Sequence, residues 1–240
     1  MLTVIPQVLD AATLVTIRQI LLAHEDAWQA GRQTAGSLAQ GGKDNAQFSR
    51  QHPAYRDMAA MGLHALSQHP LFQSAALPKT VLPPLFSRYR DGQAYGSHVD
   101  NALQRDADTQ ALVRTDVSVT LFLNDPSCYT GGELIIQDAY GEHAVKLAAG
   151  DAVIYPATSV HRVAPVSAGT RLAMVTWAQS LVKDAAQRAI LHDLDISQLL
   201  LRQTLQHQLA SDTTAWAQIA PRLDSLTQVY HNLLRQWAEV

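Results

Sequence analysis

The sequence predicts an α+β protein in which an antiparallel β-sandwich or barrel lies between two helical regions. Residues 81–180 hold short β-prone runs separated by turn residues, which is typical of such a core. Residues 1–80 and 181–240 instead repeat apolar side chains every three or four positions, as helices do. Strands and helices do not alternate, and this argues against a Rossmann-type sheet. We therefore expect three regions: 1–80 packed on the core, the core at 81–180, and an extension at 181–240.

In the N-terminal region, the apolar spacing predicts a helix over residues 11–28 with Asp10 as its cap. Residues 31–45 are rich in Gly, Ser, Gln and Asn, and this composition predicts a loop. A second helix is expected over about 53–67, before the break at Pro70.

The core region contains seven β-prone runs, which are LFSRYR, VSVTLFLN, GELIIQD, HAVKL, DAVIYP, VHRVAPV and RLAMVTWA. Turn pairs such as Asp91-Gly92 and Gly131-Gly132 separate them. Runs of this length and spacing favour antiparallel strands joined by short connections.

The C-terminal region has a long apolar stripe, which includes Leu223, Leu226, Tyr230, Leu233 and Trp237. Such a stripe is too large to leave in water, so it must pack on the core or on another copy of the chain. We expect packing on the core, because no flexible linker follows the strand that ends near Trp177. Self-association as a homo-oligomer through residual apolar surface is a secondary option.

Composition excludes several classes of protein. The chain has 240 residues, a formal net charge of −3 and 16% charged residues, which argues against binding bulk nucleic acid or an anionic membrane. Its single cysteine, Cys128, cannot form an intramolecular disulfide or a cysteine-rich metal site. No signal peptide and no run long enough to span a bilayer are recognisable. We therefore expect a cytoplasmic protein without a membrane partner.

The residues that carry chemistry begin with His98-Val99-Asp100. In a strand, positions i and i+2 point to the same face, so the imidazole and the carboxylate could ligate one metal ion; a polar turn is the alternative. His161 lies in a later run of the same region. Two histidines and one carboxylate form the facial triad of non-heme iron(II) oxygenases, which leaves positions open for a co-substrate and dioxygen.

Arg171 follows His161 by ten residues, across a predicted turn at Gly169. An arginine that points inward from an apolar strand is costly unless an anion meets it, and guanidinium binds a carboxylate in bidentate fashion. The triad and Arg171 together suit a 2-oxo acid that chelates the metal and is anchored at its far end. The alternative for Arg171, taken alone, is an exposed strand residue.

These motifs resemble a known family. FSRYRDGQAYGSHVDNA, GGELII and GDAVIYPATSVHRVAPVSAGTRLAMVTWAQS are similar to iron(II)- and 2-oxoglutarate-dependent dioxygenases of the prolyl 4-hydroxylase type. GRQTAG with Lys43-Asp44-Asn45, and QSLVKDAAQRAILHDLD, resemble the bacterial PKHD-type hydroxylases. The resemblance implies a double-stranded β-helix, or jelly roll, with flanking helices.

For the site, the resemblance implies iron ligands at His98, Asp100 and His161, a 2-oxoglutarate contact at Arg171, and a further contact at Tyr89. It also implies hydroxylation of a small-molecule or peptidyl substrate by dioxygen, with 2-oxoglutarate converted to succinate and carbon dioxide. L-Ascorbate (vitamin C) is implied as a reductant. Some animal prolyl hydroxylases have a tyrosine where this chain has Phe122, which puts specificity for peptidyl proline in doubt.

Two other functions fit the same region. A cupin-like metalloenzyme would be expected to show His-x-His with a following Glu, which the sequence lacks. The second alternative function is that of a non-catalytic sensor or interaction module on the same scaffold. The segment 101–114, with Arg105, Asp106, Asp108 and Arg114, is either a substrate-handling loop or a solvated connection.

Overall fold

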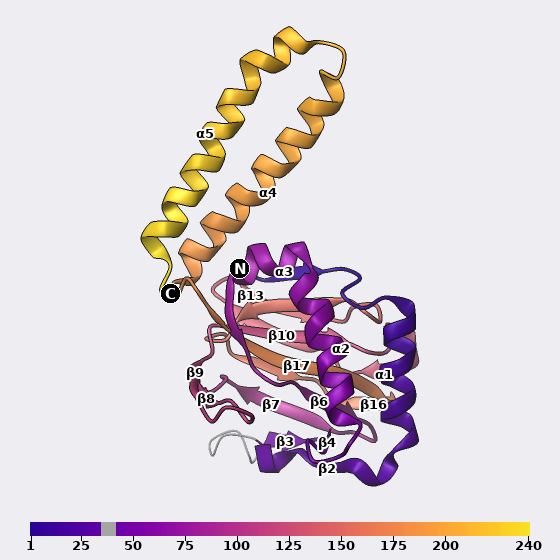
Figure 1. Cartoon of the computed structure of the whole chain (residues 1–240). Helices are drawn as coiled ribbons and strands as arrows, with labels where there is room; N and C mark the ends of the chain where they lie inside the picture. The colour runs from indigo at the N-terminus through magenta and orange to yellow at the C-terminus, as the bar shows by residue number, and fades with distance from the viewer. Residues whose placement is uncertain (35–41) are drawn as a thin grey trace.

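The computed structural model describes residues 1–34 and 42–240, so part of the loop predicted at 31–45 lies outside the described residues. The predicted α+β class is confirmed, with two antiparallel sheets at the centre of the molecule (Figure 1). Five α-helices lie in the described part of the chain: α1 (Ala11–Ala23), α2 (Tyr55–Gln68), α3 (Pro70–Ala76), α4 (Ala185–Gln208) and α5 (Thr213–Trp237).

The larger sheet has the strand order β1-β14-β10-β17-β6-β4-β2, and β5 pairs with β17 beside this path. Its strands are β1 (Thr3–Ile5), β2 (Trp28–Ala30), β4 (Ala46–Phe48), β5 (Pro78–Val81), β6 (Leu85–Tyr89), β10 (Val117–Phe122), β14 (Ala152–Pro156) and β17 (Arg171–Ser180). The smaller sheet has the order β13-β12-β15-β7-β3. Its strands are β3 (Lys43–Asp44), β7 (Ala94–His98), β12 (Leu134–Asp138), β13 (Gly141–Val145) and β15 (His161–Val163).

Two short ribbons complete the β structure. They pair β11 (Tyr129–Gly131) with β16 (Val166–Gly169), and β8 (Leu103–Arg105) with β9 (Leu112–Arg114). All the pairings found are antiparallel, as the turn-separated runs predict.

Strand β17 shows how alternation divides the molecule into layers. Leu172 and Met174 belong to a core cluster with residues of α1 and α2, whereas Arg171, Val175 and Trp177 line a cavity on the opposite face. Helix α2 comes close to this strand at Gly62, where a Cβ atom would meet the Met174 Sδ. Helices α1 and α2 therefore cover one face of the larger sheet and leave its other face for the site.

The first helix is shorter than the sequence predicts. Asp10 caps it as expected, since its side chain accepts from the Thr13 backbone N–H at 2.7 Å. The helix ends at Ala23, however, and Trp28 begins strand β2. Pairing of β2 with β4 supplies backbone hydrogen bonds that outweigh the helical spacing. The second predicted helix corresponds to α2, and Pro70 starts the unpredicted α3, since proline is tolerated in the first turn.

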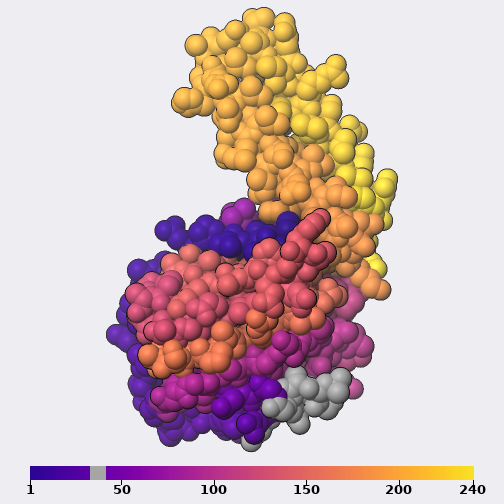
Figure 2. Space-filling view, turned by 180° about the vertical axis from the view of Figure 1, so that it is seen from behind, coloured from indigo at the N-terminus to yellow at the C-terminus, as the bar shows by residue number. Residues whose placement is uncertain are grey.

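The expectation that the C-terminal helices pack along the core is wrong. Helices α4 and α5 pair with each other as a hairpin that projects from the body, and the view from behind shows the same arrangement (Figures 1 and 2). Leu223 is the buried residue of α5, whereas Leu199, Leu200 and Leu201 of α4 are exposed. Only the base of the hairpin meets the body, through a cluster that contains Leu77, Val182, Leu191 and Trp237. No helix in the described ranges is long and apolar enough to cross a membrane.

Candidate metal centre and carboxylate pocket

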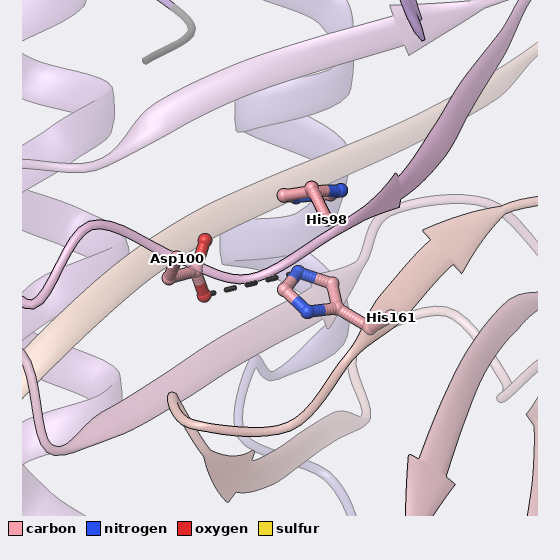
Figure 3. Close-up of side chains that lie close together, drawn as sticks. All are labelled: His98, Asp100 and His161. Atoms are coloured by element: carbon pink, nitrogen blue, oxygen red, sulfur yellow. Dashed lines mark ion pairs between the residues drawn. The ribbon is translucent and has the colours of Figure 1, made fainter. Parts of the chain in front are cut away.

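The two histidines of the predicted triad meet because their strands are neighbours in the smaller sheet. His98 ends β7 and His161 begins β15, and the two residues are partners in the antiparallel register. Asp100 lies two residues beyond the end of β7, so the expectation that one strand carries both His98 and Asp100 holds only for His98. The three side chains converge (Figure 3), and one ligand atom of each lies within 4.8 Å of the others. The His161 Nε2 is 3.8 Å from the Asp100 Oδ2.

Hydrogen bonds to the backbone hold both rings in place. The His98 Nδ1 is 2.8 Å from the Gly96 carbonyl oxygen, and the His161 Nδ1 is 3.0 Å from the Ser159 carbonyl oxygen. With the proton on Nδ1, each Nε2 lone pair is left for a metal. The Ser118 hydroxyl donates to the Asp100 Oδ2, which orients the carboxylate. These contacts are the second layer of support that metal sites use to fix their ligands.

The electrostatics of the site also suit a cation. Burial and the neighbouring His161 lower the pKa of His98 to about 4, so this imidazole is neutral at pH 7. The two histidine rings lie 4.2 Å apart between centroids, and the Tyr95 ring stacks on His98 at 3.7 Å. Two imidazole nitrogens and one carboxylate oxygen that converge on one point are a donor set that fits Fe(II) and leaves other coordination positions open.

Arg171 begins β17 opposite Tyr89 of β6, and only 1% of its surface is exposed. Its guanidinium carbon lies 5.3 Å from the ring centroids of both Tyr89 and Phe122. The Nε atom is buried and has no hydrogen-bond partner. Within residues 1–34 and 42–240, Arg171 forms no ion pair. A buried cation in this state calls for an anionic ligand, which is what the sequence predicts here.

The GGELII motif contributes to this pocket through Gly132. The residue has a φ of 69°, which favours glycine, and a Cβ atom would lie 3.1 Å from the Arg171 Cδ. Glycine therefore leaves room for the arginine stem.

The triad and Arg171 open onto one cavity of about 330 Å³. Tyr89 lines it as well, and burial raises the pKa of its hydroxyl, so the phenol keeps its proton and can donate a hydrogen bond. A ligand that reaches from the metal ligands to the guanidinium would therefore stay within one cavity.

Sequence reasoning missed several residues of the cavity wall, among them Tyr155, Lys43 and Tyr95. Burial raises the pKa of Tyr155 well above its usual value, and its ring meets His161 edge-on at 5.1 Å. Burial lowers the pKa of Lys43 to about 8, although Asp100 opposes this fall. Tyr155 and Lys43 come from β14 and β3, which carry none of the candidate ligands, whereas Tyr95 precedes His98 by three residues in β7.

Other sequence-based assignments need correction or completion. Trp177, to which the sequence analysis gives no role in the site, lines the cavity and has a buried indole N–H without a partner. Its place on the same face of β17 as Arg171, six residues on, could have revealed it. In the segment 101–114, Asn101 and Gln104 reach the cavity, whereas Arg114 is ion-paired with Asp116 and Glu239. Cys128 is exposed and does not line the cavity.

Comparisons with known proteins agree with this geometry. The 2OG-Fe(II) oxygenase superfamily matches residues 84–179, and the PKHD-type hydroxylase C-terminal domain matches residues 185–239. A PKHD-type hydroxylase of Psychrobacter sp. strain PRwf-1 is 53% identical over 263 residues, and one of Hyphomonas neptunium is 50% identical over 239 residues. Each of these alignments covers 100% of both chains.

Solved structures confirm the jelly-roll fold. A prolyl-4-hydroxylase of Pseudomonas putida has a TM-score of 0.51 at 22% identity, covering 75% of this chain and 92% of its own. A non-heme alpha-ketoglutarate-dependent carbocyclase from nogalamycin biosynthesis has a TM-score of 0.54 at 15% identity, covering 75% and 80%. By its full-length similarity to relatives of about half identical sequence, the chain belongs to the PKHD-type hydroxylases of the 2OG-Fe(II) oxygenase superfamily and is a 2-oxoglutarate-dependent dioxygenase.

Proposed function

We propose that His98, Asp100 and His161 hold Fe(II) and that Arg171 binds the distal carboxylate of 2-oxoglutarate. The observation that carries this proposal is that the three candidate ligands and the guanidinium border the same cavity. Bound iron would supply the oxidising chemistry by which dioxygen hydroxylates a substrate while 2-oxoglutarate becomes succinate and carbon dioxide.

The protein's own residues would bind and orient the reactants. His98 and His161 offer imidazole nitrogens, and Asp100 offers a carboxylate with one oxygen hydrogen-bonded to Ser118. Tyr89, beside Arg171, would donate a hydrogen bond from its phenol to the co-substrate. Apolar wall residues, which include Leu134, Val163 and Val175, would limit water in the cavity.

Two measurements test this function. Succinate formation by the purified protein should require iron, 2-oxoglutarate and oxygen together, and Asp100→Ala should abolish it. Incubating the enzyme with cell extract and these reagents should reveal a metabolite that gains the mass of one oxygen. If the iron-loaded wild-type protein forms no succinate even with extract present, the proposed reaction is wrong.

We predict three further properties of the protein. Ascorbate should restore activity to enzyme that has lost it during turnover, which a time course with and without ascorbate would test. A cytoplasmic location should appear in cell fractionation, and the mass in solution should decide the oligomeric state. A non-catalytic sensor is not favoured, because the triad and Arg171 are both intact.

A further inference from the structure

The hairpin of α4 and α5 buries little of its own surface. Leu191 and His192 contact the body, and further out the only buried residues of these two fully described helices are Gln198 and Leu223. Helices in proteins owe most of their stability to the packing of an apolar face. Two helices of 24 and 25 residues that project from the body therefore call for a further packing surface (Figures 1 and 2).

The two broad sides of the hairpin differ in chemistry. In α4, a rotation of about 100° per residue turns Leu199 and Leu201 to opposite sides of the buried Gln198. Arg202 turns to the side of Leu199, and its Nη2 is 2.8 Å from the Oδ1 of Asp224 in α5. An ion pair between the helices therefore crosses this first side.

The opposite side is apolar in both helices. In α5, the same rotation turns Leu226 and Val229 away from Asp224. Apolar residues at helical spacing make up this apolar side, which consists of Ile190, Leu194, Leu201, Leu226, Val229 and Leu233. Ile190, Leu201 and Val229 are between 47% and 51% exposed. Large apolar side chains that line up on one exposed surface mark an interaction site.

A second hairpin of the same kind fits the apolar side in size and in charge. At 1.5 Å per residue the helices are about 36 Å long, and two helices side by side are about 20 Å wide, so this side spans about 700 Å². A stable interface buries about 800 Å² on each partner. Helices α4 and α5 together hold four arginines and three aspartates, so two hairpins repel each other little.

We propose that the enzyme is a homodimer in which the apolar sides of two hairpins pack face to face as a four-helix bundle. A two-helix hairpin with one apolar side is half of such a bundle. A second copy presents the same side, as a twofold-symmetric contact requires. None of the six residues of the apolar side lines the cavity of the candidate metal centre, so the inference does not depend on the proposed reaction.

The mass of the full chain in solution tests the dimer, by analytical ultracentrifugation. Wild-type protein at about 50 μM should have twice the mass of one chain, and dilution should lower it towards one chain. Leu201→Glu should weaken the association about tenfold or more, because the dimer would bury an unpaired carboxylate. Leu199→Glu is the matched control and should dimerise as the wild type does. Both leucines are 47% exposed, and they differ in the side of α4 that they occupy.

Two further measurements separate dissociation from misfolding. Val229→Glu places the same charge on the apolar side from α5 and should also dissociate the dimer. The helix content and the melting temperature of the body should match the wild type in all three variants, because only the base of the hairpin contacts the body. In wild-type protein, amide hydrogen exchange in α4 and α5 should speed up as dilution dissociates the dimer, whereas exchange in β10 and β17 should not change.

Several results would overturn the inference. Wild-type protein that stays monomeric at about 50 μM would do so, and a different protein bound to its apolar side would then be the occupant. A dimer that survives both Leu201→Glu and Val229→Glu would use another surface. Equal dissociation by Leu199→Glu and Leu201→Glu would also contradict the assignment, as would hairpin exchange that does not follow the mass.

Discussion

Replacing Arg171 by methionine tests whether this side chain binds the co-substrate or only supports the fold. Methionine keeps an unbranched apolar stem between Tyr89 and Phe122 but removes the charge. A charge-assisted hydrogen bond contributes about 1.5–3 kcal/mol, so losing the contact should weaken 2-oxoglutarate binding about ten- to a hundredfold. Iron binding should not change, because the arginine is not among the candidate ligands.

Arg171→Met should weaken 2-oxoglutarate binding without lowering the stability of the ligand-free protein. The guanidinium is almost wholly buried, and its Nε has no partner. An apolar side chain of similar length removes this unfavourable burial, so the free energy of unfolding should stay the same or rise. A loss of several kcal/mol would mean that Arg171 is structural.

The assay compares two 2-oxo acids in oxygen-free Fe(II) protein. Their binding would be followed by the charge-transfer absorption of the iron chelate. 2-Oxobutanoate has the chelating end of 2-oxoglutarate but no distal carboxylate, so wild-type protein should prefer 2-oxoglutarate and Arg171→Met should lose that preference. Arg162→Met is the control, because Arg162 pairs with Glu142 at the surface. Unchanged 2-oxoglutarate affinity in Arg171→Met would refute the assignment.

Three further predictions concern the metal centre and the hairpin. Ser118→Ala removes the hydrogen bond to Asp100 and should weaken metal binding about 10–100-fold by calorimetry, with an unchanged affinity counting against an orienting role. Metal-free protein should lose stability as pH falls from 6.5 towards 4, because the unfolded chain protonates His98 first; His98→Gln should flatten that slope in denaturant titrations. Truncation before Lys183 should give unstable protein, because it uncovers Leu77 and Val182. Deleting only the far end of the hairpin, with Leu191 and Trp237 kept, should leave the melting temperature nearly unchanged.

Strong local patterns predicted much of the secondary structure. The seven β-prone runs all contribute strands, and Asp10 caps the first helix as its sequence context indicates. Short strands such as β2 and β3 were missed, because two or three residues show no periodicity and owe their conformation to the neighbouring strand. The helices of the C-terminal extension were predicted, but an apolar stripe does not say which surface will cover it.

For the site, the sequence by itself determined the candidate ligands and the candidate anion-binding arginine. The spacing of His98 and Asp100 is a local feature that backbone geometry can interpret. A hairpin that joins the strands of His161 and Arg171, which the turn at Gly169 suggests, does not form, because β15 lies in the smaller sheet and β17 in the larger one. Only the tertiary structure decided that β7 lies beside β15, and that Lys43, Tyr155 and Trp177 enter the same cavity. Those contacts join residues far apart in the chain, and they depend on strand register and on how two sheets pack, which no local pattern encodes.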